Sequence, residues 1–126
     1  MSSRIANICI DAHDPYSQMR WWSHLLADFT MPDDETQESA DDECGLRGPD
    51  GRWFLFLRVP EDKTVKNRQH ICLRPTDRDR DAEVERVLAL GASMVDDRRD
   101  GPDFGWAVLA DPEGNEFCIL RRDATS

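Results

Sequence analysis

The chain has 126 residues, enough for one domain with a substantial shared core. Acidic residues outnumber basic ones by 26 to 16, so no basic patch stands out that would bind nucleic-acid phosphates. No apolar stretch approaches the ~20 residues that cross a membrane, and no signal-peptide h-region follows Met1. We therefore expect a soluble, cytoplasmic protein with no nucleic-acid or membrane partner, whose four cysteines are free thiols.

The first half of the chain predicts a strand, a helix and a hairpin. Residues 5–11 alternate, with Ile8 and Ile10 on one face, as in a half-buried strand. Asp14 and Pro15 form a helix start, a capping carboxylate followed by proline. The helix should end at Pro32. Its apolar stripe should pack against Ile8 and Ile10 and consists of Met19, Trp22, Leu26 and Phe29. A hairpin follows, with strands at 44–47 and 53–59 around a turn at 48–51.

An acidic run separates the helix from the hairpin. Residues 33–43 carry seven carboxylates and no basic residue. Such a run is typical of a solvated loop, although it also favours a cationic ligand by raising its local concentration.

The second half repeats the same order of elements after a polar linker at about 60–68. Residues 69–74 predict a strand with Ile71 and Leu73 facing a helix and His70, Cys72 and Arg74 facing away. The helix is expected over 77–90, ending before Gly91, which suits a left-handed cap. Strands at 93–95, 106–110 and 116–121 complete this half, the last two joined by a turn at 111–114.

A constant offset of 63 residues, half of the chain length, superposes the two halves. Residues 46–57 fall on 109–120, residues 7–10 fall on 70–73, and Leu25 falls on Leu88. The chain is therefore a tandem duplication of one small module, with module 1 at about 4–59 and module 2 at about 69–122 of a single domain, 1–126. A duplicated open module usually closes on its copy, and the concave surface near the resulting axis is where a ligand would lie.

Three segments carry a family resemblance that covers nearly the whole chain. The segments 63–70 (KTVKNRQH), 89–92 (ALGA) and 111–118 (DPEGNEFC) resemble the small bacterial glyoxalase-like branch of the vicinal oxygen chelate superfamily. That superfamily includes glyoxalase I, bleomycin-resistance proteins and extradiol dioxygenases. The resemblance implies an α+β fold of two tandem βαβββ modules that form a curved sheet, or half-barrel, around a concave cavity. It also implies a homodimer, and Trp21, which lies off the helix stripe, is a candidate interface residue.

The resemblance also implies where a metal would bind in the metal-dependent members. The four ligand positions correspond here to Asn7, Leu55, His70 and Cys118. Leucine has no lone pair and asparagine is a weak ligand, so we expect no cofactor and no metal of the usual imidazole and carboxylate type. Glyoxalase I activity is correspondingly not expected. One alternative metal site remains, a sulfur-rich site that binds a divalent metal. Strand parity predicts that its four ligands all lie on the concave face; they are Cys9, His70, Cys72 and Cys118. His70 and Cys72 are two residues apart on a strand, about 6.5–7 Å between α-carbons, which is wider than most zinc pairs prefer.

The residues that face the predicted cavity indicate a binding protein rather than a metalloenzyme. We predict a metal-independent binder of a small organic molecule, with a cationic compound favoured by the charge, similar to the bleomycin-resistance group; the expected lining is Asn7, Asp11, Trp53, Leu55, His70, Arg74, Trp106 and Cys118. The alternative is an enzyme of the lyase, isomerase or dioxygenase type, in which His70 and Cys118 act as base and nucleophile.

Overall fold

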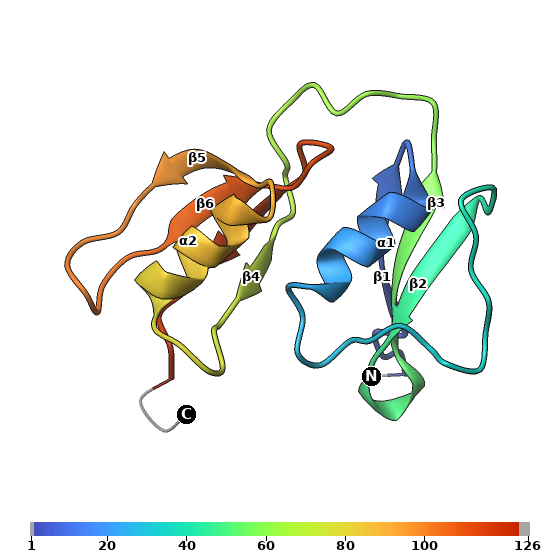
Figure 1. Ribbon diagram of the computed structural model, residues 1–126, viewed down its shortest axis with the longest axis horizontal. Helices are drawn as coiled ribbons and strands as arrows, with labels where there is room; N and C mark the ends of the chain where they lie inside the picture. Colours follow the sequence, from blue (N-terminus) through green and yellow to red (C-terminus); the bar gives the residue numbers. More distant parts are fainter. Residues whose placement is uncertain (1, 124–126) are drawn as a thin grey trace. The chain divides into compact units, whose positions relative to one another are not determined.

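The computed structural model describes residues 2–123, which form two compact units divided between Asp62 and Lys63. The first unit contains one helix and a three-stranded sheet in the order β1-β3-β2 (Figure 1). Its elements are β1 (Asn7–Ala12), α1 (Pro15–Ser23), β2 (Glu43–Arg47), the short 3-10 helix η1 (Pro49–Gly51) and β3 (Trp53–Arg58). The second unit contains one helix and a four-stranded sheet in the order β4-β7-β6-β5. Its elements are β4 (Ile71–Leu73), α2 (Arg80–Ala89), β5 (Ser93–Asp97), β6 (Ala107–Ala110) and β7 (Glu116–Ile119).

Strand pairing confirms the duplication residue by residue. In the first unit β1 runs parallel to β3 with Cys9 opposite Leu55, and in the second β4 runs parallel to β7 with Cys72 opposite Cys118. Adding 63 to the first pair of numbers gives the second pair. The antiparallel pairs obey the same rule, since Gly45 lies opposite Leu55 and Val108 lies opposite Cys118. The expected α+β fold of two related modules, each with a mixed sheet, is therefore confirmed.

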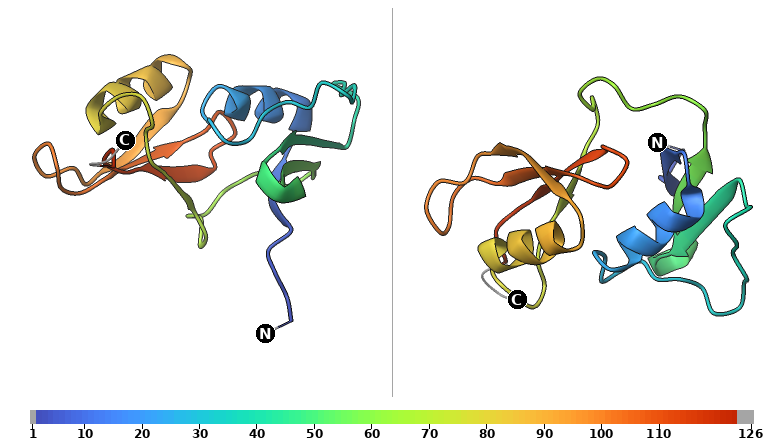
Figure 2. Two further views of the ribbon diagram at one scale, coloured as in Figure 1. Left: turned by 90° about the horizontal axis from the view of Figure 1, so that it is seen from below. Right: turned by 45° about the horizontal axis from the view of Figure 1, so that its top comes forward.

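Each unit buries one face of its sheet under its own helix (Figure 2). In the first unit Trp22 of α1 packs on Phe54 of β3, with ring centroids 5.3 Å apart, and both side chains are almost fully buried. In the second unit Val84 and Val87 of α2 are fully buried together with Phe117 of β7. The other face of the sheet in the first unit carries a mixture of polar and apolar side chains, among them Asn7, Trp53 and Leu55.

Both helices begin at a capping aspartate, as the sequence indicates. Asp14 accepts a hydrogen bond from the backbone N–H of Ser17, and Pro15 occupies the first turn of α1. Asp79 accepts from the N–H of Ala82, so α2 begins at Arg80 and not at residue 77 as predicted. Gly91 follows α2 with a φ of 114°, a region that glycine enters readily.

Three predictions for the first unit are wrong. Helix α1 ends at Ser23, so Leu26 and Phe29 lie beyond it; Phe29 reaches the core from the following loop and contacts the ring of Phe54 edge-on. Ile8 is 39% exposed instead of buried, because β1 is an edge strand and α1 packs mainly over β2 and β3. The third strand expected by analogy with the second unit is replaced by a single bridge between Thr30 and Arg47. The acidic run that follows Thr30 disfavours sheet pairing, because its like charges repel and Asp and Glu are poor strand formers.

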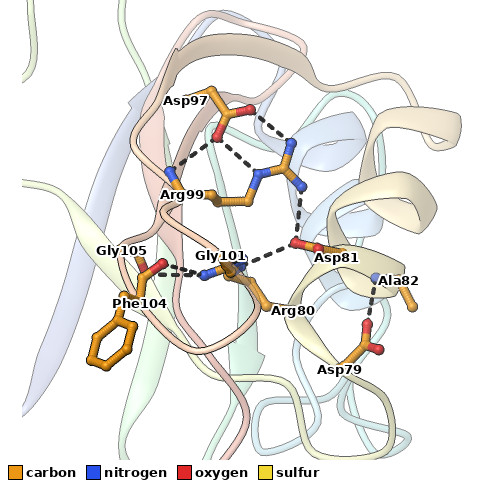
Figure 3. A network of polar contacts seen from close by, with 9 residues as sticks. All are labelled: Asp79, Arg80, Asp81, Ala82, Asp97, Arg99, Gly101, Phe104 and Gly105. Carbon is orange, nitrogen blue, oxygen red and sulfur yellow. Dashed lines mark hydrogen bonds and ion pairs between the residues drawn. The ribbon is translucent and has the colours of Figure 1, made fainter.

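A buried arginine fixes the loop that joins β5 to β6 in the second unit. Arg80 is 2% exposed and its guanidinium donates to the carbonyls of Gly101, at 2.6 Å, and Phe104, at 2.7 Å (Figure 3). Asp81 pairs with both Arg80 and Arg99 at 3.1 Å. Burial of a charge is costly unless its donors are satisfied, and these carbonyls satisfy them. The loop is therefore anchored to the first turn of α2.

Within the described part of the chain, neither α-helix has the length and apolar character of a membrane-crossing segment.

Candidate functional site

The first unit carries an open pocket on the sheet face opposite α1. Side chains alternate along β2 and β3, so that Cys44, Leu46, Phe54 and Phe56 are buried on the helix side of the sheet. The intervening residues face the other way and form the floor of a cavity of about 290 Å³. The residues that line it are Asn7, Glu35, Gln37, Glu43, Gly45, Trp53 and Leu55. Three of them, Asn7, Trp53 and Leu55, belong to the site predicted from the sequence.

The absence of a side chain at Gly45 keeps this pocket open. A Cβ atom added at Gly45 would lie 2.6 Å from Cδ2 of Leu55 and 3.1 Å from the ring of Trp53. The equivalent residue of the second unit, 63 positions later, is Val108, which is buried. Glycine at position 45 therefore leaves the Trp53 and Leu55 side chains accessible where the second module fills the space.

The acidic run borders the pocket rather than lying away from it. The side-chain amide of Gln37 accepts a hydrogen bond from the N–H of Gly45 at 2.6 Å and donates to its carbonyl at 3.0 Å. This pair of bonds holds the run against the edge of β2, and Glu35 and Glu43 both reach the pocket wall. Sequence analysis missed these residues; the only signal was the acidic run itself, which we interpreted as a solvated loop.

An arginine already lies against the aromatic wall. The guanidinium carbon of Arg47 is 4.9 Å from the ring centroid of Trp53, within the range of a cation–π contact. The same guanidinium pairs with Asp34 at 3.0 Å and with Glu35 at 3.4 Å. The Trp53 face and its neighbouring carboxylates thus accommodate a planar cation within the protein itself.

The equivalent positions in the second unit gather three metal-binding side chains. His70, Cys72 and Cys118 each offer one ligand atom, and these atoms lie within 4.8 Å of one another. His70 and Cys72 are exposed, whereas Cys118 is 2% exposed. Burial, and next the neighbouring Cys72 thiol, raise the pKa of Cys118 to about 11, so this thiol is protonated at neutral pH.

The remaining predicted residues make local contacts. Arg74 donates to the carbonyl of Arg121 at 2.6 Å and pairs with Asp123 at 3.5 Å. Trp106 directly precedes β6 and is 40% exposed, and Asp11 is exposed near the end of β1. None of these three lines the pocket of the first unit.

The donor set does not fit the imidazole and carboxylate metal site that the family resemblance implies. In the first unit the implied ligand positions hold Asn7 and Leu55, which line the pocket without a carboxylate or an imidazole at either place. In the second unit the donors are one imidazole and thiols rather than oxygens. Oxygen-rich sites suit manganese and magnesium, whereas thiolates select softer ions.

Comparison with solved structures finds the same fold at low sequence identity. Fosfomycin resistance protein FosX from Mesorhizobium loti has a TM-score of 0.67 and 21% identity, over 99% of this chain and 96% of that one. A mutant of FosX from Listeria monocytogenes, solved with Mn(II) and 1S,2S-dihydroxypropylphosphonic acid, has a TM-score of 0.69 and 18% identity, over 98% and 94%. A glyoxalase/bleomycin resistance protein/dioxygenase family enzyme from Burkholderia phytofirmans has a TM-score of 0.68 and 18% identity, over 93% and 97%.

Comparison with curated proteins finds no significant match. A family model described as the glyoxalase-like domain matches residues 7–120, which include every strand and both helices of the two modules. The duplicated modules, the mixed sheets and this match agree. The chain therefore belongs to the glyoxalase-like domain family and has the vicinal oxygen chelate fold.

Proposed function

We propose that this protein binds a small organic cation in the pocket of the first unit, and that binding requires no metal. The observation that carries the proposal is the composition of the pocket, whose lining includes the aromatic residue Trp53 and the acidic residues Glu35 and Glu43. The cavity of about 290 Å³ is at the small end of the range for organic ligands.

The chemistry of the lining favours positive charge. A cation over an indole face is attracted by the ring quadrupole, and a carboxylate at its edge adds a direct charge interaction. Arg47 shows that this wall accepts a planar cation, because its guanidinium lies against Trp53 with Glu35 as counter-charge; a ligand cation would displace it or use the rest of the lining, including Glu43. The formal net charge of −10 would raise the local concentration of a cationic ligand further.

Two features of the lining support metal independence. Leu55 has no lone pair, and the Gln37 amide is already bonded to the backbone of Gly45. The pocket carboxylates Glu35 and Glu43 do not belong to the cluster of three potential metal ligands found among the described residues, which lies in the second unit. A homodimer and a cytoplasmic location stay predictions from the sequence.

The alternative of an enzyme with a His70 base and a Cys118 nucleophile has weaker support. Reactive cysteines have a lowered pKa, because the thiolate is the nucleophile. Burial instead raises the pKa of Cys118 to about 11.

Three probes of the same size and different charge test the proposal. Isothermal titration at low ionic strength with EDTA should show binding of benzamidine, a cation, much weaker binding of neutral benzamide, and no binding of benzoate. Glu43→Gln and Trp53→Leu should each weaken benzamidine binding by about 3- to 10-fold, as expected for the loss of about 1 kcal/mol. Asp33→Asn is the matched control, because it removes one charge from the same acidic run without touching the pocket lining.

Equal binding of benzamide and benzamidine would contradict a cation site. A benzamidine affinity unchanged by Glu43→Gln and Trp53→Leu would contradict this location. Loss of binding on addition of EDTA would contradict metal independence.

A further inference from the structure

We propose that His70, Cys72 and Cys118 of the second unit bind one thiophilic cation of the zinc type, in an open three-ligand site. The site contains none of the residues that line the pocket of the first unit. It is therefore independent of the proposed ligand binding and has its own test.

Sheet register creates the cluster. β4 and β7 run parallel with Cys72 directly opposite Cys118, so their side chains leave the same face of the sheet. His70 precedes Cys72 by two residues and falls on that face as well. These three residues come together from two segments that are almost fifty positions apart in the chain, and the parallel pairing alone makes them neighbours.

The distances suit a tetrahedral ion. Zinc binds sulfur at about 2.3 Å and histidine nitrogen at about 2.0 Å, which places the ligand atoms of a tetrahedral site about 3.5–3.8 Å apart. The three ligand atoms here already lie within 4.8 Å of one another. Closing the remaining gap requires rotation of the His70 and Cys72 side chains, which are both exposed.

The arrangement leaves room for a fourth ligand. Cys118 lies buried at the base of the cluster, while His70 and Cys72 are exposed and give an ion access from solvent. Two cysteines and one histidine form a known open zinc donor set, in which water or a substrate atom takes the fourth position.

Donor softness predicts which ion binds. Thiolates select zinc and copper(I), and they discriminate against manganese, which prefers oxygen. The preference should therefore differ from that of the Listeria FosX neighbour, which was solved with Mn(II). The first unit carries no second copy of the site, because its equivalent positions hold Asn7, Cys9 and Leu55.

Cobalt is the spectroscopic probe for this site. The full chain, freed of metal with EDTA, desalted and kept reduced with a phosphine, is titrated with Co²⁺ under argon. We expect a thiolate-to-cobalt charge-transfer band and intense visible d–d bands that saturate at one equivalent. One equivalent of Zn²⁺ should remove both bands, whereas a tenfold excess of Mn²⁺ should leave them.

Matched cysteine variants locate the site. Cys72→Ser should weaken Co²⁺ binding by about a hundredfold and reduce the charge-transfer band, and His70→Ala should weaken binding similarly. Both residues are exposed, so these variants should keep the fold, which circular dichroism checks. Cys9→Ser is the control, because it removes the equivalent exposed thiol of the first unit.

Three results would overturn the proposal. The first is the absence of a charge-transfer band at one equivalent of Co²⁺. The second is an unchanged titration of Cys72→Ser, and the third is displacement of cobalt by Mn²⁺.

Discussion

The thiols of Cys44 and Cys118 show how burial changes the chemistry of a single residue. Cys44 is 1% exposed in the first unit, and Cys118 is 2% exposed in the second. The pKa of both is raised to about 11, first by burial and then by a negatively charged neighbour, the Asp41 carboxylate for Cys44 and the Cys72 thiolate for Cys118. In the absence of a metal ion both thiols are protonated at neutral pH, and the structure has both cysteines free, as expected.

These shifts predict a loss of stability in alkali. An unfolded thiol loses its proton near its ordinary pKa of 9.0, whereas folded Cys44 holds its proton up to about pH 11. The folded state therefore binds more protons between these values, and the free energy of unfolding falls as pH rises through this window. The contribution of Cys44 is fully present below pH 9 and amounts to about 3 kcal/mol at most, since one pKa unit corresponds to about 1.4 kcal/mol.

Urea unfolding of the wild-type protein and of Cys44→Ala between pH 8 and 11 measures this contribution. Cys44→Ala should be less stable at pH 8, and its free energy of unfolding should decline less steeply with pH. Parallel curves for the two proteins would show that Cys44 titrates alike in the folded and unfolded states.

The conformation of the loop between β5 and β6 depends on two glycines and on hydrogen bonds to its backbone. Arg80 binds its carbonyls, and the backbone of Arg98 pairs with that of Trp106 at its base. Gly101 and Gly105 both have positive φ, at 68° and 79°. They differ in surroundings, because a Cβ at Gly105 would collide with the carbonyl of Arg98, whereas a Cβ at Gly101 would meet nothing within 4 Å.

This difference predicts that alanine at Gly105 lowers the free energy of unfolding more than alanine at Gly101 does. Gly101→Ala should lower the free energy of unfolding by about 1 kcal/mol, the cost of a left-handed alanine. Gly105→Ala should lower it by about 3 kcal/mol or more, because backbone must move to relieve the collision. Chemical denaturation of both variants gives the comparison, and equal costs would contradict the close approach of Arg98 to Gly105.

At the scale of the whole molecule, charge is the dominant feature. The formal net charge is −10, and the exposed run 33–43 concentrates much of it. Some of these carboxylates have partners, since Asp34 and Glu35 pair with Arg47 and Asp42 pairs with Arg58 at 3.0 Å. The excess of negative charge opposes compaction through self-repulsion.

Salt should therefore stabilise the folded protein. Raising the ionic strength from about 0.01 M to about 0.15 M shortens the screening length from about 30 Å to about 8 Å. We expect the melting temperature to rise by a few degrees, and the double variant Asp33→Asn with Glu38→Gln to be more stable at low salt and less salt-dependent. Asp34→Asn is the control, since it removes a carboxylate bound to Arg47 and should give no such gain. A melting temperature that falls with added salt would show that ion pairs outweigh net repulsion.

Local patterns in the sequence are enough to predict the duplication, the α+β fold and the order of the elements. Strand alternation, helix caps and turn residues are local signals that depend only on near neighbours, and a 63-residue repeat makes each half confirm the other. The family resemblance assigns Asn7 and Leu55 to the cavity face, strand parity adds Trp53, and the structure places all three around one pocket. Cys72 and Cys118 were assigned to a common face in the same way, and β4 and β7 bring them together.

The end of α1, the exposure of Ile8 and the position of the acidic run could not be predicted in this way, because they depend on packing between distant segments. The apolar spacing of Leu26 and Phe29 continues a helical pattern, yet the chain leaves the helix at Ser23 and still brings Phe29 to Phe54. Gln37 anchors the acidic run through the backbone of Gly45, a contact between segments with no shared periodicity. Such contacts depend on sheet register and on the path of a loop. Both are settled by packing between distant residues, so no local pattern in the sequence encodes them.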